Sequence, residues 1–281
     1  MKYHFKKILL DYLLVLLFVI PAFIIIVLFA LMVFLKFREN PFFKQYRGIT
    51  FQNKYFKMLK IKTIKNINAD KPNDVNHPFL LPSIQYNFSA FTSFLRSTGF
   101  DELPQIIHVI TGKMSFVGPR PLMPNDIQFI KEKHPNEYKL RESFKSKPGI
   151  TGTWQLLGSR NMGIENLIFL EKYYEINKSL WFDIQLLMLT LTVILYAKNS
   201  DSSDAKINFY NKLFSLPGSS FLFGKIISLY QSITNSQNEY YKLLLPQDWW
   251  VQTNSVESSK TEEQLSIIKF SKENKKGNAA S

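Results

Sequence analysis

The sequence contains no cysteine, and this absence narrows the chemistry open to the protein. Disulfides, zinc sites with cysteine ligands and a cysteine nucleophile are all excluded. Histidine is also scarce, and the spacing of the four residues is not that of metal ligands, so a zinc site is not expected. The chain shows no internal repeat, no strand–helix glycine fingerprint and no zinc-finger pattern. The histidines are His4, His77, His108 and His134.

Positive charge is present in excess. The 281 residues, enough for one or two domains, carry a formal net charge of +13. A surplus of this size implies an anionic partner, such as nucleic acid, phospholipid headgroups or a phosphorylated substrate. No nucleic-acid-binding pattern accompanies the charge, and the N-terminus favours a membrane. Anionic membrane lipids are therefore expected partners, and nucleic acid is not.

Residues 8–35 form the most apolar run of the chain. As a straight helix this run would measure about 42 Å, beyond a hydrocarbon core of about 30 Å. It is too long for the apolar region of a signal peptide, and no small-residue cleavage site follows it. Basic residues mark the cytoplasmic side of a membrane, and here they flank both ends. They are Lys2, Lys6, Lys7, Lys36 and Arg38.

Pro21 lies almost at the midpoint of this run and leaves two interpretations. A tilted helix could span the membrane and tolerate the proline. Alternatively, a re-entrant helical hairpin, kinked at Pro21, enters and leaves by the cytoplasmic face, with Asp11 near the headgroups and within reach of Lys6 or Lys7. The re-entrant reading explains the matched flanks and the proline together, and it defines a first domain over residues 1–39.

The next segments predict a cytosolic domain over residues 40–198. Residues 40–65 alternate apolar and basic side chains, which favours a strand or hairpin near the membrane. Its lysines, Lys60 and Lys62 among them, are expected to face headgroups or a phosphorylated ligand. Residues 66–88 have the composition of a loop, and residues 89–98 predict a short helix.

Further along, residues 123–146 predict a charged helix. The glycine-rich segment 147–159 allows its backbone to approach another element closely at Gly149, Gly152 and Gly158. Residues 164–197 predict two helices with a break near Asn177, the second apolar but too short to span a membrane comfortably.

Residues 199–281 form a C-terminal extension that is expected to be partly disordered. It opens on a linker, keeps apolar content over residues 207–251, and ends in a polar tail. The predicted fold class is thus α+β and mostly helical, with a re-entrant N-terminal helix, short strands and amphipathic interfacial helices.

Asp101 and Glu102 are adjacent and stand just before Pro104, which is tolerated in the first turn of a helix. Neighbouring side chains on a helix point about 100° apart, so the two carboxylates cannot chelate one ion as an i,i+4 pair would. They suit separate roles, one as an attacking group and one as a ligand for Mg²⁺. From the residues alone, a purely structural role at a helix N-terminus is the more common use of such a pair.

Arg96 and Arg120 lie on either side of the acidic pair, and a guanidinium group reads phosphate in a bidentate manner. Arg120 stands between Pro119 and Pro121, a rigid presentation that suits a side chain that must be aimed. Carboxylates and arginines on a basic surface supply the charge neutralisation and positioning that phosphoryl transfer requires. An aspartate can also attack phosphorus and form a covalent intermediate.

Three motifs carry a resemblance to a known family: "DELPQ" (101–105), "GKMSFVGPRP" (112–121) and "KPGITG" (147–152). In order and spacing they resemble the signatures of the monotopic phosphoglycosyl transferases, the bacterial sugar transferase family. The segments "PFFKQYR" (41–47) and "KYFKMLKIKTI" (54–64) are similar to the region that follows the family's membrane helix. The resemblance covers roughly residues 4–197.

This resemblance implies transfer of a phospho-sugar from a nucleotide-sugar, usually a UDP-sugar, to a polyprenyl phosphate such as undecaprenyl phosphate. UMP leaves, and the product starts assembly of a glycan such as capsule, exopolysaccharide, O-antigen or glycoprotein. It implies Asp101 as the nucleophile, Glu102 as the Mg²⁺ ligand, and Arg96 and Arg120 on phosphate groups. It also implies a re-entrant break at Pro21 and a place on the cytoplasmic face of the bacterial inner membrane. The sugar, the final glycan and homo-oligomerisation stay open.

The chain departs from the family pattern at several positions, which keeps two alternatives open. A catalytically degenerate homologue could act as a membrane scaffold in a glycan-assembly complex. A basic nucleic-acid-binding membrane protein would explain the charge but not the motifs. The departures include Ile20 for serine, Lys62 for arginine, His108, Lys113, and Asn53 for glycine.

Overall fold

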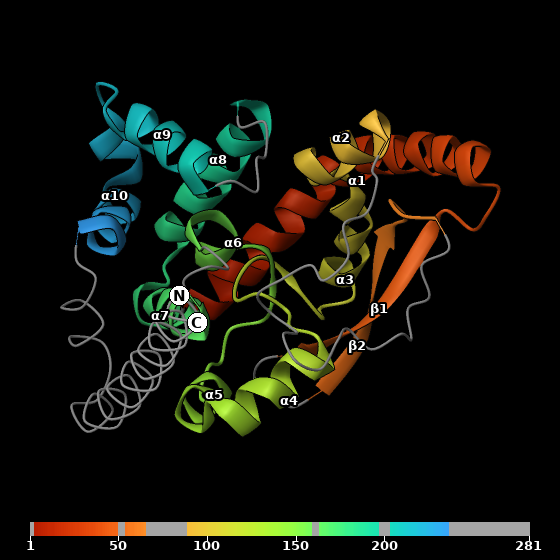
Figure 1. Cartoon of the computed structure of the whole chain (residues 1–281). Coiled ribbons are helices and arrows are strands. Elements are labelled where there is room, and N and C mark those ends of the chain that lie inside the picture. Colours follow the sequence, from red (N-terminus) through yellow and green to blue (C-terminus); the bar gives the residue numbers. More distant parts are fainter. Residues whose placement is uncertain (1–2, 50–53, 66–88, 159–162, 197–202, 236–281) are drawn as a thin grey trace, which may run out of the picture. The chain divides into compact units, whose positions relative to one another are not determined.

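A computed structural model describes the residues that form the fold, namely 3–49, 54–65, 89–158, 163–196 and 203–235. The described part is mostly helical with two small two-stranded sheets, which confirms the predicted α+β class (Figure 1). Residues 1–231 form one compact unit. The predicted loop 66–88 and the polar tail lie outside the described residues.

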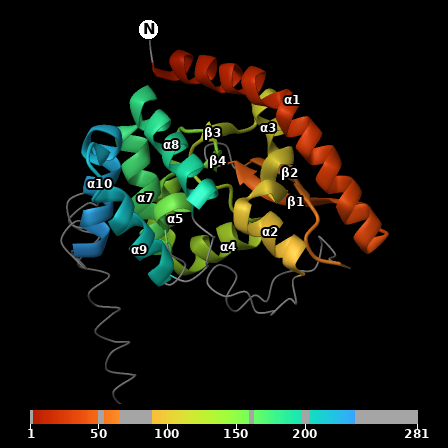
Figure 2. The ribbon, with the colours of Figure 1, turned by 90° about the horizontal axis from the view of Figure 1, so that it is seen from above.

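The apolar N-terminal run forms one helix, α1 (Tyr3–Phe37), with Pro21 inside it. A proline removes one backbone hydrogen bond and bends a helix without having to end it. Figure 2 shows that α1 changes direction along its length. The segment is thus a single bent helix, and whether it is re-entrant stays a prediction. Within the described residues, α1 is the one helix long and apolar enough to cross a membrane by length and composition.

The first half of α1 is attached to the protein body by buried polar contacts. The carboxylate of Asp11 accepts hydrogen bonds from Ser115 Oγ at 2.9 Å and from the backbone N–H of Phe116 at 3.0 Å. Lys7 forms an ion pair with Asp183 at 3.1 Å. Asp11 was expected near the headgroups beside Lys6 or Lys7. It is buried instead, because the first half of α1 lies against the strand that contains Ser115.

The second half of α1 is attached to the same body by apolar contacts. Val33 is fully buried in a cluster with Ile61 and Leu95. The ring of Phe29 packs on Phe91 and Phe100, with centroids 6.0 and 5.6 Å away. Between these two attachments most of the large side chains of α1 are exposed, as for Leu16 at 75%.

Strands β1 (Phe42–Ile49) and β2 (Lys54–Ile61) pair as the predicted antiparallel hairpin. Their register sets Arg47 opposite Phe56, and Gln45 opposite Met58. Directly paired residues share a face, and side chains alternate along a strand. Gln45, Arg47, Met58 and Lys60 therefore lie on one face of the hairpin.

The acidic pair lies in a short 3₁₀ helix, η1 (Phe100–Gln105), that follows α2 (Ala90–Thr98) and leads into α3 (Ile106–Ile110). Gly99 ends α2 with a positive φ of 73°, a conformation that favours glycine. The predicted helix start near Asp101 is confirmed in this tighter form. Successive 3₁₀ residues are about 120° apart, so the two carboxylates diverge even more than expected.

Strands β3 (Ser115–Val117) and β4 (Gly149–Thr151) form a parallel pair that brings the second and third motifs together. A Cβ atom on Gly149 would lie 2.1 Å from the backbone nitrogen of Gly118. A Cβ atom on Gly152 would lie 2.1 Å from the carbonyl oxygen of Gly118. The predicted close approach at these glycines is confirmed, and its partner is the backbone at Gly118.

Further helices follow in the family-like region. The charged segment 123–146 forms two helices rather than one, because Pro135 starts the second. The predicted break near Asn177 is confirmed. The apolar helix after it buries Phe182, Leu186 and Leu189 in the core. These helices are α4 (Pro124–Lys133), α5 (Pro135–Glu142), α6 (Thr153–Leu157), α7 (Gly163–Asn177) and α8 (Leu180–Tyr196).

Two more helices, α9 (Ser203–Phe214) and α10 (Ser219–Asn235), belong to the C-terminal extension. Their buried residues join the core cluster that contains Phe182. The division into domains at residues 39/40 and 198/199 stays a prediction, because contacts alone do not show which segments fold independently.

Candidate functional site

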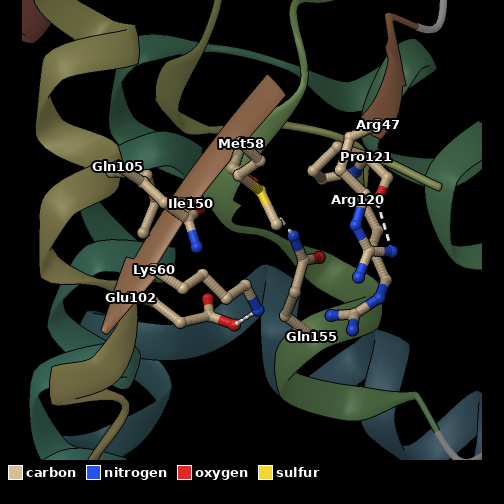
Figure 3. Close-up of a pocket in the computed structure, with 10 residues that line it drawn as sticks. Arg47, Met58, Lys60, Glu102, Gln105, Arg120, Pro121, Ile150 and Gln155 are labelled. Atoms are coloured by element: carbon tan, nitrogen blue, oxygen red, sulfur yellow. Dashed lines mark hydrogen bonds and ion pairs between the residues drawn. The ribbon is translucent and has the colours of Figure 1, made fainter. Parts of the chain in front are cut away.

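A pocket opens where the β1–β2 hairpin faces η1 and the β3–β4 motifs (Figure 3). Lys60 reaches from β2 to the carboxylate of Glu102, with Nζ 2.5 Å from Oε1. Arg47 and Arg120 lie on the opposite side of the pocket in this view. The pocket thus combines one carboxylate with three cationic side chains. It is lined by Arg47, Met58, Lys60, Glu102, Gln105, Arg120, Pro121, Gly149, Ile150 and Gln155.

Glu102 is held ionised by its basic neighbours. Burial alone would raise the pKa of this carboxyl group, but Lys60, Arg120 and Arg47 outweigh it and lower the pKa to about 2. Glu102 is therefore a permanent anion at neutral pH. One of its oxygens contacts Lys60.

Asp101 differs from its neighbour although the two are adjacent. Burial raises its pKa to about 6; the negative charge of Glu102 adds to this rise, while Lys60 and Arg96 oppose it. Lys60 therefore acts on both carboxylates. A carboxylate with a raised pKa is more basic, and hence a better nucleophile, than an ordinary one.

Arg120 is positioned through its backbone by a buried ion pair between helices α5 and α7. Arg141 Nε lies 2.9 Å from Glu171 Oε2, and both residues are almost completely buried. Glu171 accepts a hydrogen bond from the backbone N–H of Arg120 at 2.8 Å, and Arg141 donates one to its carbonyl oxygen at 2.7 Å. The guanidinium group itself lies 5.0 Å from the ring centroid of Trp154.

Arg47 is a pocket residue that the motifs did not single out. It is 8% exposed. Its guanidinium group donates to Gln45 Oε1 at 2.6 Å and to the carbonyl oxygen of Pro121 at 3.4 Å. The latter bond connects the hairpin to the residue next to Arg120. The signal in the sequence was the "QYR" of the family-like segment 41–47.

Two glutamines in the pocket were missed as well. Gln105 is 2% exposed, and its Nε2 has no hydrogen-bond partner within the described residues. Gln155 donates to the carbonyl oxygen of Gly149 at 3.3 Å, whereas its buried Oε1 has no such partner there. Buried polar atoms are normally paired, so a donor and an acceptor in one pocket indicate a polar ligand. Gln105 is the last residue of the "DELPQ" motif, and its place in this motif was the signal in the sequence that could have identified it as a site residue.

The predicted site residues separate into two groups. Glu102, Lys60 and Arg120 line the pocket, and Asp101 adjoins it on η1. Arg96 is exposed on α2 and acts on Asp101 by charge. Lys62 lies away from the pocket lining and pairs with Glu39 at 3.0 Å. Pro21 lies within α1, and the proposed phosphate-binding and membrane roles of these last residues stay predictions.

The departures from the family pattern lie outside the pocket lining as far as the structure describes them. His108 accepts a hydrogen bond from the backbone N–H of Leu59 at 3.1 Å and packs edge-on against Phe56. His108 thus supports strand β2. Lys113 is exposed after α3, and Ile20 is exposed on α1.

One group of possible metal ligands occurs elsewhere among the described residues, at His134, Glu137 and Glu165. His134 Nδ1 lies 3.6 and 3.4 Å from the two carboxylates. Their hydrogen bonds raise the pKa of His134 to about 9, against the opposing effect of burial. Without a metal, this group is therefore an ion-pair cluster at neutral pH, and a metal would have to displace the proton of His134.

Comparison with known proteins supplies a family for this arrangement. The profile of the bacterial sugar transferase family matches residues 2–197. A sugar transferase of Bacillus subtilis, EpsL, itself uncharacterised, is 32% identical over 176 residues, which cover 62% of this chain and 80% of EpsL.

Two relatives with specific names are similar over a shorter region. The undecaprenyl-phosphate galactose phosphotransferase of Salmonella typhimurium is 36% identical over 38% of this chain and 21% of its own length. The UDP-glucose:undecaprenyl-phosphate glucose-1-phosphate transferase of Escherichia coli is 42% identical over 35% of this chain and 22% of its own. The chain spans only about a fifth of such relatives, as the matched shares of 21%, 20% and 21% show.

The ion pair behind Arg120 gives a first prediction. Glu171→Gln leaves the charge of Arg141 buried without its partner, which costs about 3–5 kcal/mol. For a protein of this size the melting temperature should fall by roughly 6–20 °C, as measured by thermal unfolding in detergent. Glu132→Gln, at an exposed position on α4, is the control and should change the melting temperature little. Equal melting temperatures for the two variants would contradict this role of the ion pair.

Proposed function

Because the chain belongs to the bacterial sugar transferase family, we propose that it transfers a phospho-sugar from a nucleotide-sugar to polyprenyl phosphate. The observation that carries the proposal is the pocket, in which the ionised Glu102 lies with Lys60, Arg47 and Arg120, next to Asp101, whose pKa is raised. The names of the Salmonella and Escherichia coli relatives support undecaprenyl phosphate as the acceptor, and the latter supports a UDP-sugar as the donor. The product would start assembly of a bacterial polysaccharide.

The reaction would proceed in two displacements on one phosphorus atom. In the first, the Asp101 carboxylate attacks the phosphorus that carries the sugar, and the bond to the nucleotide breaks so that UMP leaves with the electron pair. In the second, an oxygen of polyprenyl phosphate attacks the aspartyl phosphosugar and displaces the carboxylate. The products are UMP and a polyprenyl diphosphosugar, and Asp101 is regenerated.

The cationic side chains would bind the diphosphate and neutralise the charge that develops on its oxygens. Lys60 provides a compact charge, while Arg47 and Arg120 provide planar groups that suit phosphate oxygens. Gln105 is expected to donate its unpaired Nε2–H to a phosphate or sugar oxygen. Arg96 attracts Asp101 from outside the pocket lining and would bind phosphate at its edge.

The residues present fit a role for Mg²⁺. Glu102 is ionised, its side chain is 32% exposed, and Lys60 contacts one of its two oxygens. Mg²⁺ is commonly held by one or two carboxylates together with substrate phosphates. Because the pocket is otherwise cationic, the ion would bind together with the negatively charged diphosphate, with Glu102 as its protein ligand. Bound there, Mg²⁺ would neutralise phosphate charge.

We further propose that α1 is re-entrant and holds a cytosolic catalytic domain at the cytoplasmic face of the inner membrane. Asp11 and Phe29 both contact the same protein body. In a straight helix they would be about 27 Å apart, nearly the full depth of a hydrocarbon core of about 30 Å. A helix crossing the membrane would carry one of these attachments to the far side. The exposed apolar side chains between them suit burial in lipid, and the basic flanks suit anionic headgroups.

The scaffold alternative finds less support in the pocket. It rests on the departures from the family pattern, and Ile20, Lys62, His108 and Lys113 all lie outside the pocket lining. The proposed nucleophile, metal ligand and phosphate-binding residues are all present.

The reaction itself gives the second prediction. Purified protein with Mg²⁺, undecaprenyl phosphate and a panel of UDP-sugars should release UMP with one or a few donors. Asp101→Asn should abolish release, and mass spectrometry of the wild type quenched without acceptor should detect a phosphosugar on Asp101. Glu132→Gln should retain turnover. Full turnover by Asp101→Asn would exclude this nucleophile, and a lack of UMP from every donor would favour the scaffold.

The pKa of Asp101 gives a third prediction, on pH dependence. Asp101 must be ionised to attack, so kcat/KM should fall about tenfold per pH unit as the pH drops below about 6. Lys60→Gln removes a positive charge that lowers the pKa of Asp101. The acidic limb of the profile, normalised to its plateau, should therefore move to higher pH.

The control for this experiment is Lys57→Gln. Lys57 lies on the other face of the same strand and is exposed. Its profile should match that of the wild type. If the acidic limb of the kcat/KM profile moved equally in Lys60→Gln and Lys57→Gln, the shift would not be due to the loss of the charge at position 60.

The topology gives a fourth prediction, which the absence of native cysteine makes simple to test. His4→Cys and Lys36→Cys place single thiols at exposed positions near the two ends of α1. A membrane-impermeant maleimide should label both in inside-out vesicles and neither in intact spheroplasts. Ile20→Cys, in the middle of the helix, should resist labelling from either side. Labelling of the two ends from opposite sides would defeat the re-entrant model.

A further inference from the structure

Helices α9 and α10 lie beyond residue 197, where the match to the family ends. Both views place them beside α7 and α8 (Figures 1 and 2). Tyr210, Phe223 and Ile226 are at most 5% exposed and belong to the same core cluster as Leu156 and Phe182. The family-like region therefore depends on this extension for part of its core.

Tyr210 connects α9 to α6, the helix that contains the pocket residue Gln155. Its hydroxyl group donates a hydrogen bond of 2.7 Å to the carbonyl oxygen of Leu156 in α6. Its ring is fixed by Phe214, stacked nearly parallel at 5.6 Å, and by Tyr230, edge-on at 5.5 Å. A fixed ring directs its hydroxyl group to one place.

Helix α6 is short, so its position depends on contacts outside the helix. The last carbonyl groups of a helix lack intrahelical partners, and in five residues these make up most of the acceptors. At its first residue, Thr153 Oγ1 donates to the carbonyl oxygen of Leu170 in α7 at 2.8 Å. Near the other end of α6, the hydroxyl group of Tyr210 donates to the carbonyl oxygen of Leu156. The helix is thus held by α7 at one end and by α9 at the other.

Of the two side chains between these attachments, one contacts a pocket residue and the other lines the pocket. The ring of Trp154 lies against the guanidinium group of Arg120. Gln155 lines the pocket with its unpaired Oε1. A small displacement of α6 would move both a cation–π partner of Arg120 and a hydrogen-bond acceptor. Interactions of this kind determine how a polar ligand is oriented.

We propose that Tyr210 is a positioning residue for substrate binding, and that the C-terminal extension is a required part of the pocket. Through Leu156, Tyr210 fixes α6, and α6 presents Gln155 to the bound nucleoside diphosphate-sugar and Trp154 to Arg120. The ligand class rests on the proposed function. The positioning of α6 does not.

The test compares two hydroxyl deletions in the full-length protein. Tyr210→Phe removes the bond to α6 and keeps the ring. Tyr230→Phe is the matched control, because its hydroxyl group bonds to Asn211 Oδ1 at 3.1 Å within the extension itself. Hydrogen–deuterium exchange is measured on the peptide covering residues 153–158, and steady-state kinetics are measured with the UDP-sugar that the wild type accepts.

In Tyr210→Phe, exchange at α6 should rise about tenfold, as expected for loss of one buried hydrogen bond. KM for the nucleotide-sugar should rise severalfold with kcat within about twofold of wild type, since Asp101 is untouched. Tyr230→Phe should leave both quantities unchanged.

Three other results would be decisive. Equal exchange at α6 in the two variants would overturn the positioning role. Faster exchange in Tyr210→Phe with an unchanged KM would overturn the link to the pocket. If the wild type releases no UMP from any donor, the proposed function fails, while faster exchange confined to Tyr210→Phe would still support the positioning of α6.

Discussion

The contact between Lys60 and Glu102 is the interaction on which the site depends. It joins the hairpin that follows α1 to the short helix that carries both acids. Without a positive charge there, two adjacent carboxylates in a half-buried turn would repel each other. With it, Glu102 is a stable anion while Asp101 stays easier to protonate. Burial of Asp101, together with the charges of Lys60, Arg120 and Arg47 on Glu102, thereby makes two chemically similar residues different enough for separate tasks.

The pocket fixes its cations by different means. Arg120 is held at its backbone by Glu171 and Arg141, whose charges compensate each other in the core. Arg47 is held by a neutral amide and a carbonyl oxygen. Both arginines also act by charge on Glu102 and lower the pKa of its carboxyl group.

Much of the fold could be predicted from local patterns, and the site only in part. Alternation predicted the hairpin, and the apolar runs predicted α1 and the break at Asn177. The same alternation would place Lys60 and Lys62 on one face, but β2 ends at Ile61, and Lys62 turns to Glu39 instead. Arg47 and Gln155 reach the pocket through strand register and the packing of α6. Such long-range contacts leave no local pattern in a single sequence.

The attachment of α1 at both halves has a consequence for the height of the site above the lipid. On the proposed topology, the helix and the catalytic body move as one rigid piece, so insertion depth sets how far the pocket lies from the headgroup plane. The protein would then respond to surface charge and headgroup packing more than to bilayer thickness. The acceptor phosphate, which lies at that same plane, would meet the pocket by diffusion in two dimensions.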